Sequence, residues 1–472
     1  MDVSRSSTVV FFASIGTTAA GFVGHVYFAR VLGPELLGAF FLFQALLTVS
    51  IVGTDLGVGT GVEKQLSGAS DREETFSTAV AFYAVTVGAV VCGILLFSAT
   101  IDRYVGIEVA ALLAVAVCAK QCKRLLNTTL KGELRVGEIA GPMLVDRVGW
   151  VAVGAALLAL GFGVESLVYG TIFGSVVGLV WIAAKIDTSF TRPSLDRLRS
   201  LLGFAKYNFV PSLGLQVHNW MDVLIIGYFL SQSAVGAYET AWKVSTITTI
   251  LATSVSTTVL PQTSAWDSGE ELDRIERLLS SAITPSILLV VPAFFGVVAL
   301  APNILGLLFG PEFTVASLAL VVLVAGKIPE AIQLLVGRCL LGMDKPNLVA
   351  RATVWTIGLN LLLNVVLVVQ FGLVGAAVAT TASFTVGLLL RAKYLSSLMD
   401  LRIPYREVGW CVVASVGMYA AVVSATAVFP ADTLPRLFGV VLLAAVVYGS
   451  ILLLFGRLRT RAVGLARSFS PL

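Results

Sequence analysis

Apolar runs of about twenty residues follow one another along almost the whole chain, with only short connectors between them. A helical run of this length spans the hydrocarbon core of a bilayer and satisfies its own backbone hydrogen bonds there. The composition agrees, because 57% of the 472 residues are hydrophobic and only 13% are charged. A typical soluble domain is about a quarter charged. We therefore predict an all-α polytopic membrane protein without an extramembrane domain.

The apolar pattern predicts about 14 transmembrane helices. We expect two six-helix lobes at 7–185 and 204–397, joined by a cytoplasmic connector at 186–203. Two further helices are expected at 406–456, and a basic cytoplasmic tail at 457–472. The predicted spans are 7–29, 37–61, 76–100, 107–126, 139–161, 164–185, 204–230, 237–262, 278–301, 313–337, 349–369, 373–395, 407–429 and 435–456.

Short matches between the two halves indicate an internal duplication. Gly-Ala-Phe at 38–40 corresponds to Gly-Ala-Tyr at 236–238, which lies 198 positions later. Two further matches share an offset of 209 positions, and all of them occur in the same order along the chain. Six spans per half make the repeats parallel, related by an axis along the membrane normal. The matches at the offset of 209 are 162–164 with 371–373 and 178–179 with 387–388.

Lys and Arg are distributed very unevenly over the connectors. If the N-terminus is cytoplasmic, 26 of the 32 Lys and Arg residues lie on the cytoplasmic side and three lie outside. The remaining three lie within spans. Basic residues accumulate on the cytoplasmic side of membrane proteins. We therefore predict a multi-pass protein of the cytoplasmic (cell) membrane with both termini in the cytoplasm. The three outside residues are Arg30, Arg103 and Arg436.

The ionisable residues within spans are the candidates for function, because a charge in lipid is costly and usually faces a cavity or a partner. The chain carries no nucleotide-binding loop and no Cys/His cluster with metal-ligand spacing, so we expect no cofactor, no metal and no catalytic residue. Two acid–base pairs follow helical spacing, Glu239 with Lys243 and Lys327 with Glu330. Ion pairs that hold helices in register explain them as well as a role in a substrate cleft does.

Lys120, Lys123 and Arg124 lie near the predicted inner end of the fourth span. Extension of these long side chains to the interface is the favoured interpretation. Attraction of an anionic lipid headgroup is the alternative. Asn360 and Asn364 are four residues apart, and hydrogen bonds between helices explain them better than ligand binding does.

Several stretches in chain order carry a family resemblance. They are residues 29–34 with Gly38; Asp222, Gly227, 236–238 and Ala241; 302–313; 342–346; and Asn360, Asn364 and 371–377. Together they resemble the Wzx-type polysaccharide flippases of the multidrug/oligosaccharidyl-lipid/polysaccharide (MOP) exporter superfamily. Lipid II flippases of this superfamily carry an Arg-Asp pair where this chain has Gly24 and His25, which favours another lipid-linked glycan.

The resemblance implies a non-enzymatic flippase that moves a polyprenyl- or dolichyl-phosphate-linked sugar or oligosaccharide across the membrane by alternating access. Its partners would be this lipid-linked glycan, membrane lipids and the glycosyltransferases, polymerase or oligosaccharyltransferase of a surface polysaccharide or glycoprotein pathway, with no nucleic acid. The expected substrate-binding cations of the cleft are Arg30, Arg147, Lys243 and Lys327, and the candidates for ion or proton coupling are His25, His218 and Asp222.

Two alternatives remain at this point. The first is a multidrug or cation antiporter of the same superfamily, although those proteins usually have twelve helices. The second is a membrane glycan polymerase, although such enzymes generally present a large extramembrane loop that this sequence lacks.

Overall fold

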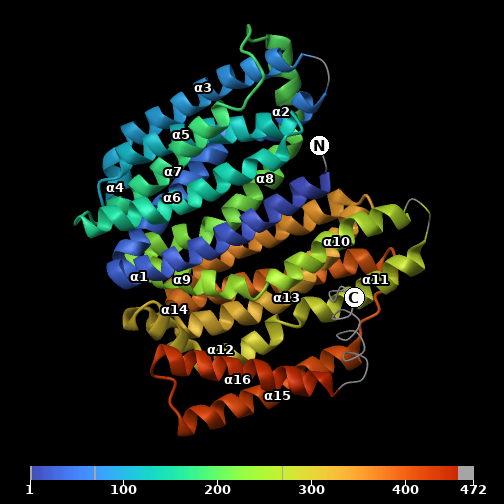
Figure 1. Ribbon diagram of the computed structural model, residues 1–472. Coiled ribbons are helices and arrows are strands. Elements are labelled where there is room, and N and C mark those ends of the chain that lie inside the picture. The colour runs from blue at the N-terminus through green and yellow to red at the C-terminus, as the bar shows by residue number, and fades with distance from the viewer. Residues whose placement is uncertain (1–2, 69–70, 268, 270, 455–472) are drawn as a thin grey trace. The chain divides into compact units, whose positions relative to one another are not determined.

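The computed structural model describes residues 3–68, 71–267, 269 and 271–454, without the side chains of 3–15 and 206–218. All regular structure in the described part is helical (Figure 1). The chain forms two compact units, Met1–Gly236 and Ala237–Leu472. The predicted all-α polytopic fold is therefore confirmed.

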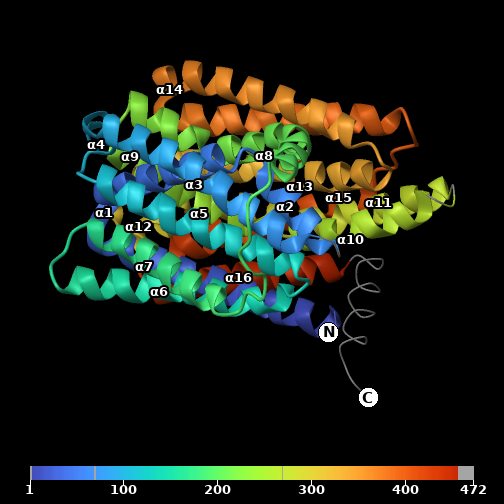
Figure 2. The same cartoon turned by 90° about the horizontal axis from the view of Figure 1, so that it is seen from above.

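In the first unit, α1 bends at Gly33, where the backbone adopts φ 72°. This positive φ suits glycine, and it separates the two spans predicted within this one helix. Helices α6 and α7 lie side by side in Figures 1 and 2. The elements are α1 Val3–Asp55, α2 Val58–Ser67, α3 Arg72–Leu96, α4 Ser98–Val105, α5 Ala110–Gly132, η1 Val136–Ile139, α6 Ala140–Ala159, α7 Glu165–Ala183 and α8 Leu195–Phe229.

In the second unit, α14 has a similar break at Gly372, with φ 57°. The last two helices, α15 and α16, lie beside each other (Figure 1) and pack against α12 through a buried apolar cluster. The elements are α9 Gln232–Ile247, which begins in the first unit, α10 Ile250–Asp267, α11 Leu272–Ile287, α12 Val290–Leu308, η2 Pro311–Ala316, α13 Ser317–Gly342, α14 Pro346–Ser396, α15 Tyr405–Val428 and α16 Leu434–Leu453.

Among the described residues, nine helical segments are long and apolar enough to cross a membrane. The number rises to eleven if the bent pairs α4–α5 (97°) and α9–α10 (56°) each form one crossing. The prediction of fourteen crossings is compatible with these segments, because α1 and α14 each contain two predicted spans.

Equivalent glycines make equivalent close contacts in the chain. A Cβ atom on Gly38 would overlap the carbonyl oxygen of Gln232, and one on Gly236 would overlap that of Pro34. Both the glycines and the carbonyls are 198 positions apart, so the contact is reciprocal. Gly132 packs in the same way against α2, and Gly342 packs against α10. These contacts support the internal repeat.

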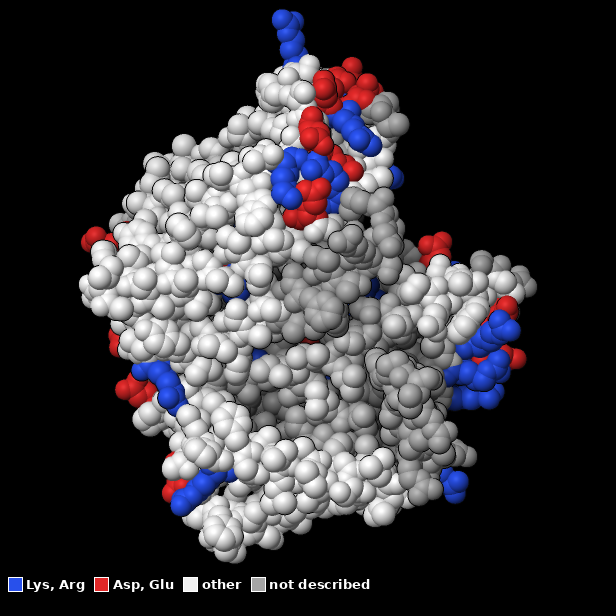
Figure 3. All heavy atoms as spheres, viewed as in Figure 1, with Lys and Arg blue, Asp and Glu red and all other residues white. Residues whose placement is uncertain are grey.

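The surface of the visible face is mainly uncharged (Figure 3). Acidic and basic side chains gather in clusters at its edges, and the broad areas of described residues between them carry almost none. Such a surface suits contact with lipid over the length of the helices. The chain is a multi-pass membrane protein.

Candidate functional site

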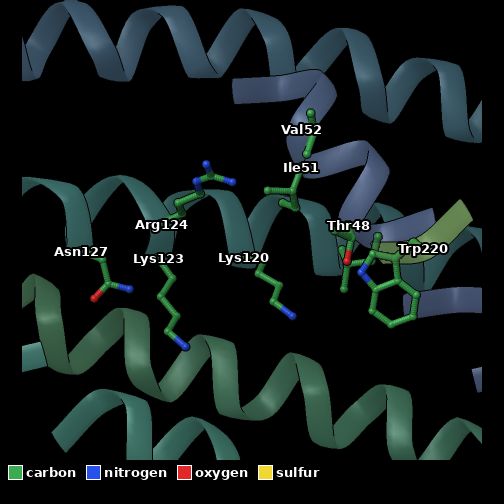
Figure 4. Close-up of a pocket in the computed structure, with 9 residues that line it drawn as sticks. Thr48, Ile51, Val52, Lys120, Lys123, Arg124, Asn127 and Trp220 are labelled. Atoms are coloured by element: carbon green, nitrogen blue, oxygen red, sulfur yellow. The ribbon is translucent and has the colours of Figure 1, made fainter. Parts of the chain in front are cut away.

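Helix α5 brings three basic side chains to one pocket of the first unit. Lys120, Lys123 and Arg124 line a pocket of about 350 Å³ together with one face of α1 and Trp220 of α8. Figure 4 shows Lys120 and Lys123 pointing the same way from α5, while Arg124 points to the opposite side. The remaining lining residues are Leu47, Thr48, Ile51, Val52 and Asn127.

Two of these three cations are held by carboxylates from other helices. Lys123 Nζ lies 2.9 Å from Asp146 Oδ2 of α6, and the Lys123 side chain is only 9% exposed. Arg124 Nη2 lies 3.2 Å from Asp55 Oδ2 at the end of α1. The hydroxyl of Tyr83 donates to the other oxygen of Asp55 at 2.8 Å. Lys123 therefore does not extend to the membrane interface, because its ammonium group is bound inside the unit.

The third cation, Lys120, makes no ion pair with a carboxylate in the part of the chain that the structure describes. It is half-buried. Its electrostatic neighbours are Asp146, Lys123 and, on α6, Arg147. The four cations of this region thus face two carboxylates, Asp55 and Asp146, and positive charge is in excess. An excess cation within a membrane span is stabilised by an anionic ligand or by water.

The sequence profile of the polysaccharide biosynthesis protein family matches residues 27–318. The probable low-salt glycan biosynthesis flippase Agl15 of Haloferax volcanii is 41% identical over 462 residues, which cover 98% of each chain. The chain belongs to the polysaccharide biosynthesis protein family. A second relative is the probable flippase AglR of the same organism, 27% identical over 96% of this chain and 95% of that protein. The predicted resemblance to polysaccharide flippases is confirmed.

Solved structures of other proteins share the fold of this chain. The inward closed conformation of the lipid II flippase MurJ has a TM-score of 0.81 and 15% identity, and the match covers 95% of this chain and 99% of that one. An inward-facing multidrug resistance MATE family transporter has a TM-score of 0.62 and 16% identity, over 81% of this chain and 95% of that one. At these identities the likeness concerns the fold alone.

Two of the four predicted cleft cations, Arg30 and Arg147, lie in the first unit. Arg30 and Arg147 are both exposed. The guanidinium carbon of Arg147 lies 5.5 Å from the centre of the Trp150 ring. Arg147 also packs over Gly21 of α1, since a Cβ atom there would lie 3.0 Å from its Nε.

The other two predicted cations lie in the second unit, each paired with an acid of its own helix. Lys243 Nζ is 2.8 Å from Glu239 Oε1. Lys327 Nζ is 2.8 Å from Glu330 Oε2, and its side chain is only 1% exposed. The Lys327 ammonium also lies 3.9 Å from the centre of the Trp242 ring. A cleft shared by all four predicted cations stays a prediction.

The predicted coupling residues are partly described. His25 is buried, 3% exposed, with its ring 5.5 Å from that of Phe41. Asp222 is also buried, at 7% exposure. The side chain of His218 lies outside the described residues. Their role in ion or proton coupling stays a prediction.

The sequence pattern favours the membrane interface for the α5 cations and does not predict the pocket that they line. The useful signal was the spacing of three cations within five residues of one apolar helix, combined with lone acids, Asp55 and Asp146, in other spans. Helical spacing shows which residues of one helix are neighbours, but it does not show which distant helix supplies the partner.

Proposed function

We propose that this chain is a flippase that moves a lipid-linked sugar or oligosaccharide across the cytoplasmic membrane without changing it covalently. The near-complete match to Agl15, which is named as a probable glycan biosynthesis flippase, supports this function. The structural observation that carries it is Lys120, the pocket-lining cation without an ion pair to a described carboxylate. The phosphate of a polyprenyl or dolichyl carrier supplies the missing negative charge.

The physical reason is the cost of moving a phosphate through the hydrocarbon core. A bare charge in this environment is strongly unfavourable unless it is paired and hydrogen-bonded. Hydrogen bonds between ammonium or guanidinium groups and phosphate oxygens are among the strong ones in proteins. In this mechanism Lys120 binds the phosphate, while the bonded Lys123 and Arg124 hold the pocket's positive field in place. The lipid tail stays in the bilayer.

The wider scheme is also part of this proposal. The lobes 7–185 and 204–397 exchange access to the two sides of the membrane around the bound headgroup, and both termini face the cytoplasm. Arg30, Arg147, Lys243 and Lys327 line the substrate path, and His25, His218 and Asp222 couple transport to an ion or proton. Glycosyltransferases supply the substrate, and a polymerase or oligosaccharyltransferase consumes it.

The direct test is flipping by the purified protein in liposomes that contain a lipid-linked glycan, measured as the fraction accessible from each leaflet. We expect Lys120→Gln to reduce the initial rate about tenfold or more, because a charge-assisted hydrogen bond contributes about 1.5–3 kcal/mol. Lys120→Arg keeps the charge and should retain most of the rate.

Lys131 provides the matched control on the same helix. It is exposed, and its ammonium lies 3.9 Å from an exposed Glu63 carboxylate. Lys131→Gln should flip the glycan at a rate within about twofold of the unmodified protein, because an exposed pair contributes little. Normal flipping by Lys120→Gln would remove the pocket from the mechanism. Export of cationic drugs without any glycan flipping would favour the antiporter instead.

A further inference from the structure

Arg391 of the second unit is another cation on a candidate membrane-spanning helix, and it has no acidic partner among the described residues. It lies on the second half of α14, five residues before the helix ends at Ser396, and it is half-buried. Within the part of the chain that the structure describes, no carboxylate forms an ion pair with it. By contrast, Lys327 of α13 in the same unit forms an ion pair, with its Nζ 2.8 Å from Glu330 Oε2.

Two neutral side chains orient the Arg391 guanidinium. Its Nη2 donates to Thr353 Oγ1 at 3.0 Å. Its Nη1 donates to the Gln333 side-chain oxygen at 2.6 Å, with the amide oriented so that its nitrogen donates to the Phe384 carbonyl at 2.9 Å. These partners fix the direction of the guanidinium, but neither of them neutralises its charge.

The guanidinium is directed into the unit and not toward the end of its helix. Gln333 joins Arg391 to the Phe384 carbonyl, which lies seven residues earlier in α14, about 10 Å deeper along the helix axis. Long side chains in helices point toward the N-terminus of their helix, which explains this direction. Gly337 of α13 lies beside it, since a Cβ atom there would be in van der Waals contact with Nη1, at 3.7 Å. Extension to the interface therefore does not account for Arg391.

One donor of this guanidinium is still available. Arg391 Nε is buried and has no hydrogen-bond partner among the described residues. A buried donor without a partner is unfavourable, and so is an uncompensated charge within a membrane span. A single phosphate group satisfies both requirements, because guanidinium binds phosphate oxygens through charge-assisted hydrogen bonds.

We propose that Arg391, oriented by Gln333 and Thr353, binds the phosphate group of a lipid within the second unit. Two sources offer this chemistry, a membrane phospholipid and the phosphate of the lipid-linked glycan. The site itself does not depend on the proposed flippase function, since the first source is present in any membrane. If the second source applies, the substrate meets a separate phosphate site in each unit.

The test measures lipid binding to the purified full-length protein by native mass spectrometry. The Lys120→Gln background weakens the pocket of the first unit, so that binding at Arg391 is seen separately. The probes are phosphatidylglycerol, dolichyl phosphate and diacylglycerol, which lacks phosphate. We expect Arg391→Gln to weaken binding of at least one phosphate lipid about tenfold or more and to leave diacylglycerol unchanged. Arg391→Lys should weaken it by a few fold, because the fork of donors is lost.

Two further variants control for folding and for general charge. Thr353→Val keeps Arg391 but removes the Nη2 hydrogen bond, and it should weaken phosphate-lipid binding about threefold. Arg351 lies on the same helix and is exposed. Arg351→Gln should bind all three lipids as the background protein does. If Arg391→Gln fails to fold, an unchanged affinity in Thr353→Val overturns the proposal.

The two lipid sources give different results. Equal affinity for phosphatidylglycerol and dolichyl phosphate identifies a phospholipid site, whereas a clear preference for dolichyl phosphate identifies the substrate. If folded Arg391→Gln binds both phosphate lipids as tightly as the background protein, the site does not exist. The flippase proposal fails on a separate readout, the flipping rate of Lys120→Gln.

Discussion

Lys123 of the first unit and Gln333 of the second occupy equivalent places in the repeat, but Lys123 is charged and Gln333 is neutral. Lys123 packs over Gly178 of α7, since a Cβ atom on this glycine would lie 3.0 Å from the lysine Cε. Gln333 packs over Gly387 of α14, where a Cβ atom would lie 2.6 Å from the end of the Gln333 amide. The two glycines are 209 positions apart and the two polar residues 210. One place thus carries a charge, and its counterpart carries a neutral amide.

The partners of the two residues differ in the same way. Asp146 binds Lys123 in the first unit. At the corresponding position 210 residues later stands Thr356, whose hydroxyl shares with Gln333 the space over Gly387. The repeat has therefore kept its backbone packing while its polar groups diverged. The excess charge of the first unit lies on α5, whereas in the second unit Arg391 of α14 makes no ion pair with a carboxylate of the described residues.

The largest loss of stability is expected from Asp146→Asn, which removes the ion pair between Asp146 and Lys123. Lys123 would then be left as an uncompensated cation near Lys120 and Arg147. Removing one partner of a buried ion pair costs about 3–5 kcal/mol. Because the Asp146 side chain is 33% exposed, we expect a smaller loss of unfolding free energy, about 2 kcal/mol. Denaturant unfolding in detergent measures it.

The double variant Lys123→Gln with Asp146→Thr gives the first unit the polar groups of the second. Since it leaves no unpaired charge at this place, its stability should return to within about 1 kcal/mol of the unmodified protein. A double variant as unstable as Asp146→Asn would show that the comparison between the two places is wrong.

A smaller effect is expected when Lys327 is changed to Gln. This substitution removes the 2.8 Å ion pair with Glu330 and the ammonium from the face of Trp242, and we expect a loss of about 1–2 kcal/mol. Lys120→Gln should change the unfolding free energy by less than about 0.5 kcal/mol. Lys120→Gln should thus slow flipping with little loss of stability, whereas Lys327→Gln should lower the stability as well. A larger loss of stability in Lys120→Gln would contradict this expectation.

The sequence predicted the features that depend on local pattern. Helix lengths follow from apolar runs, and the break at Gly33 coincides with a predicted connector. The match between Gly38 and Gly236, which indicated the duplication, falls where each glycine lies against a backbone carbonyl. The pocket was not predicted, because the pairing of Lys123 with Asp146 joins α5 to α6 through tertiary packing. The same applies to Arg391, whose partners come from α13 and from a distant turn of α14.

A smaller loss of stability than that of Lys327→Gln is expected from exchanging the charges of Glu239 and Lys243. The two residues form an i, i+4 pair at 2.8 Å, with Glu239 6% exposed and Lys243 36% exposed. Such pairs contribute about 0.2–0.5 kcal/mol, and the native order with Glu first is the better one. We expect the exchanged protein to lose about 1 kcal/mol or less, because the pair is kept.

The rate of transport distinguishes a role of Lys243 in the substrate path from a purely structural role of its ion pair with Glu239. If Lys243 serves the substrate path, Lys243→Ala and the exchanged protein should both flip the lipid-linked glycan about tenfold more slowly, whereas Glu239→Gln should keep most of the rate. An ion pair with a purely structural role predicts the opposite order, because the exchanged protein keeps the pair and both single variants lose it. Normal flipping by a stable exchanged protein would therefore leave Lys243 as a helix-stabilising residue, and the excess charge of α5 would be the stronger candidate for phosphate binding.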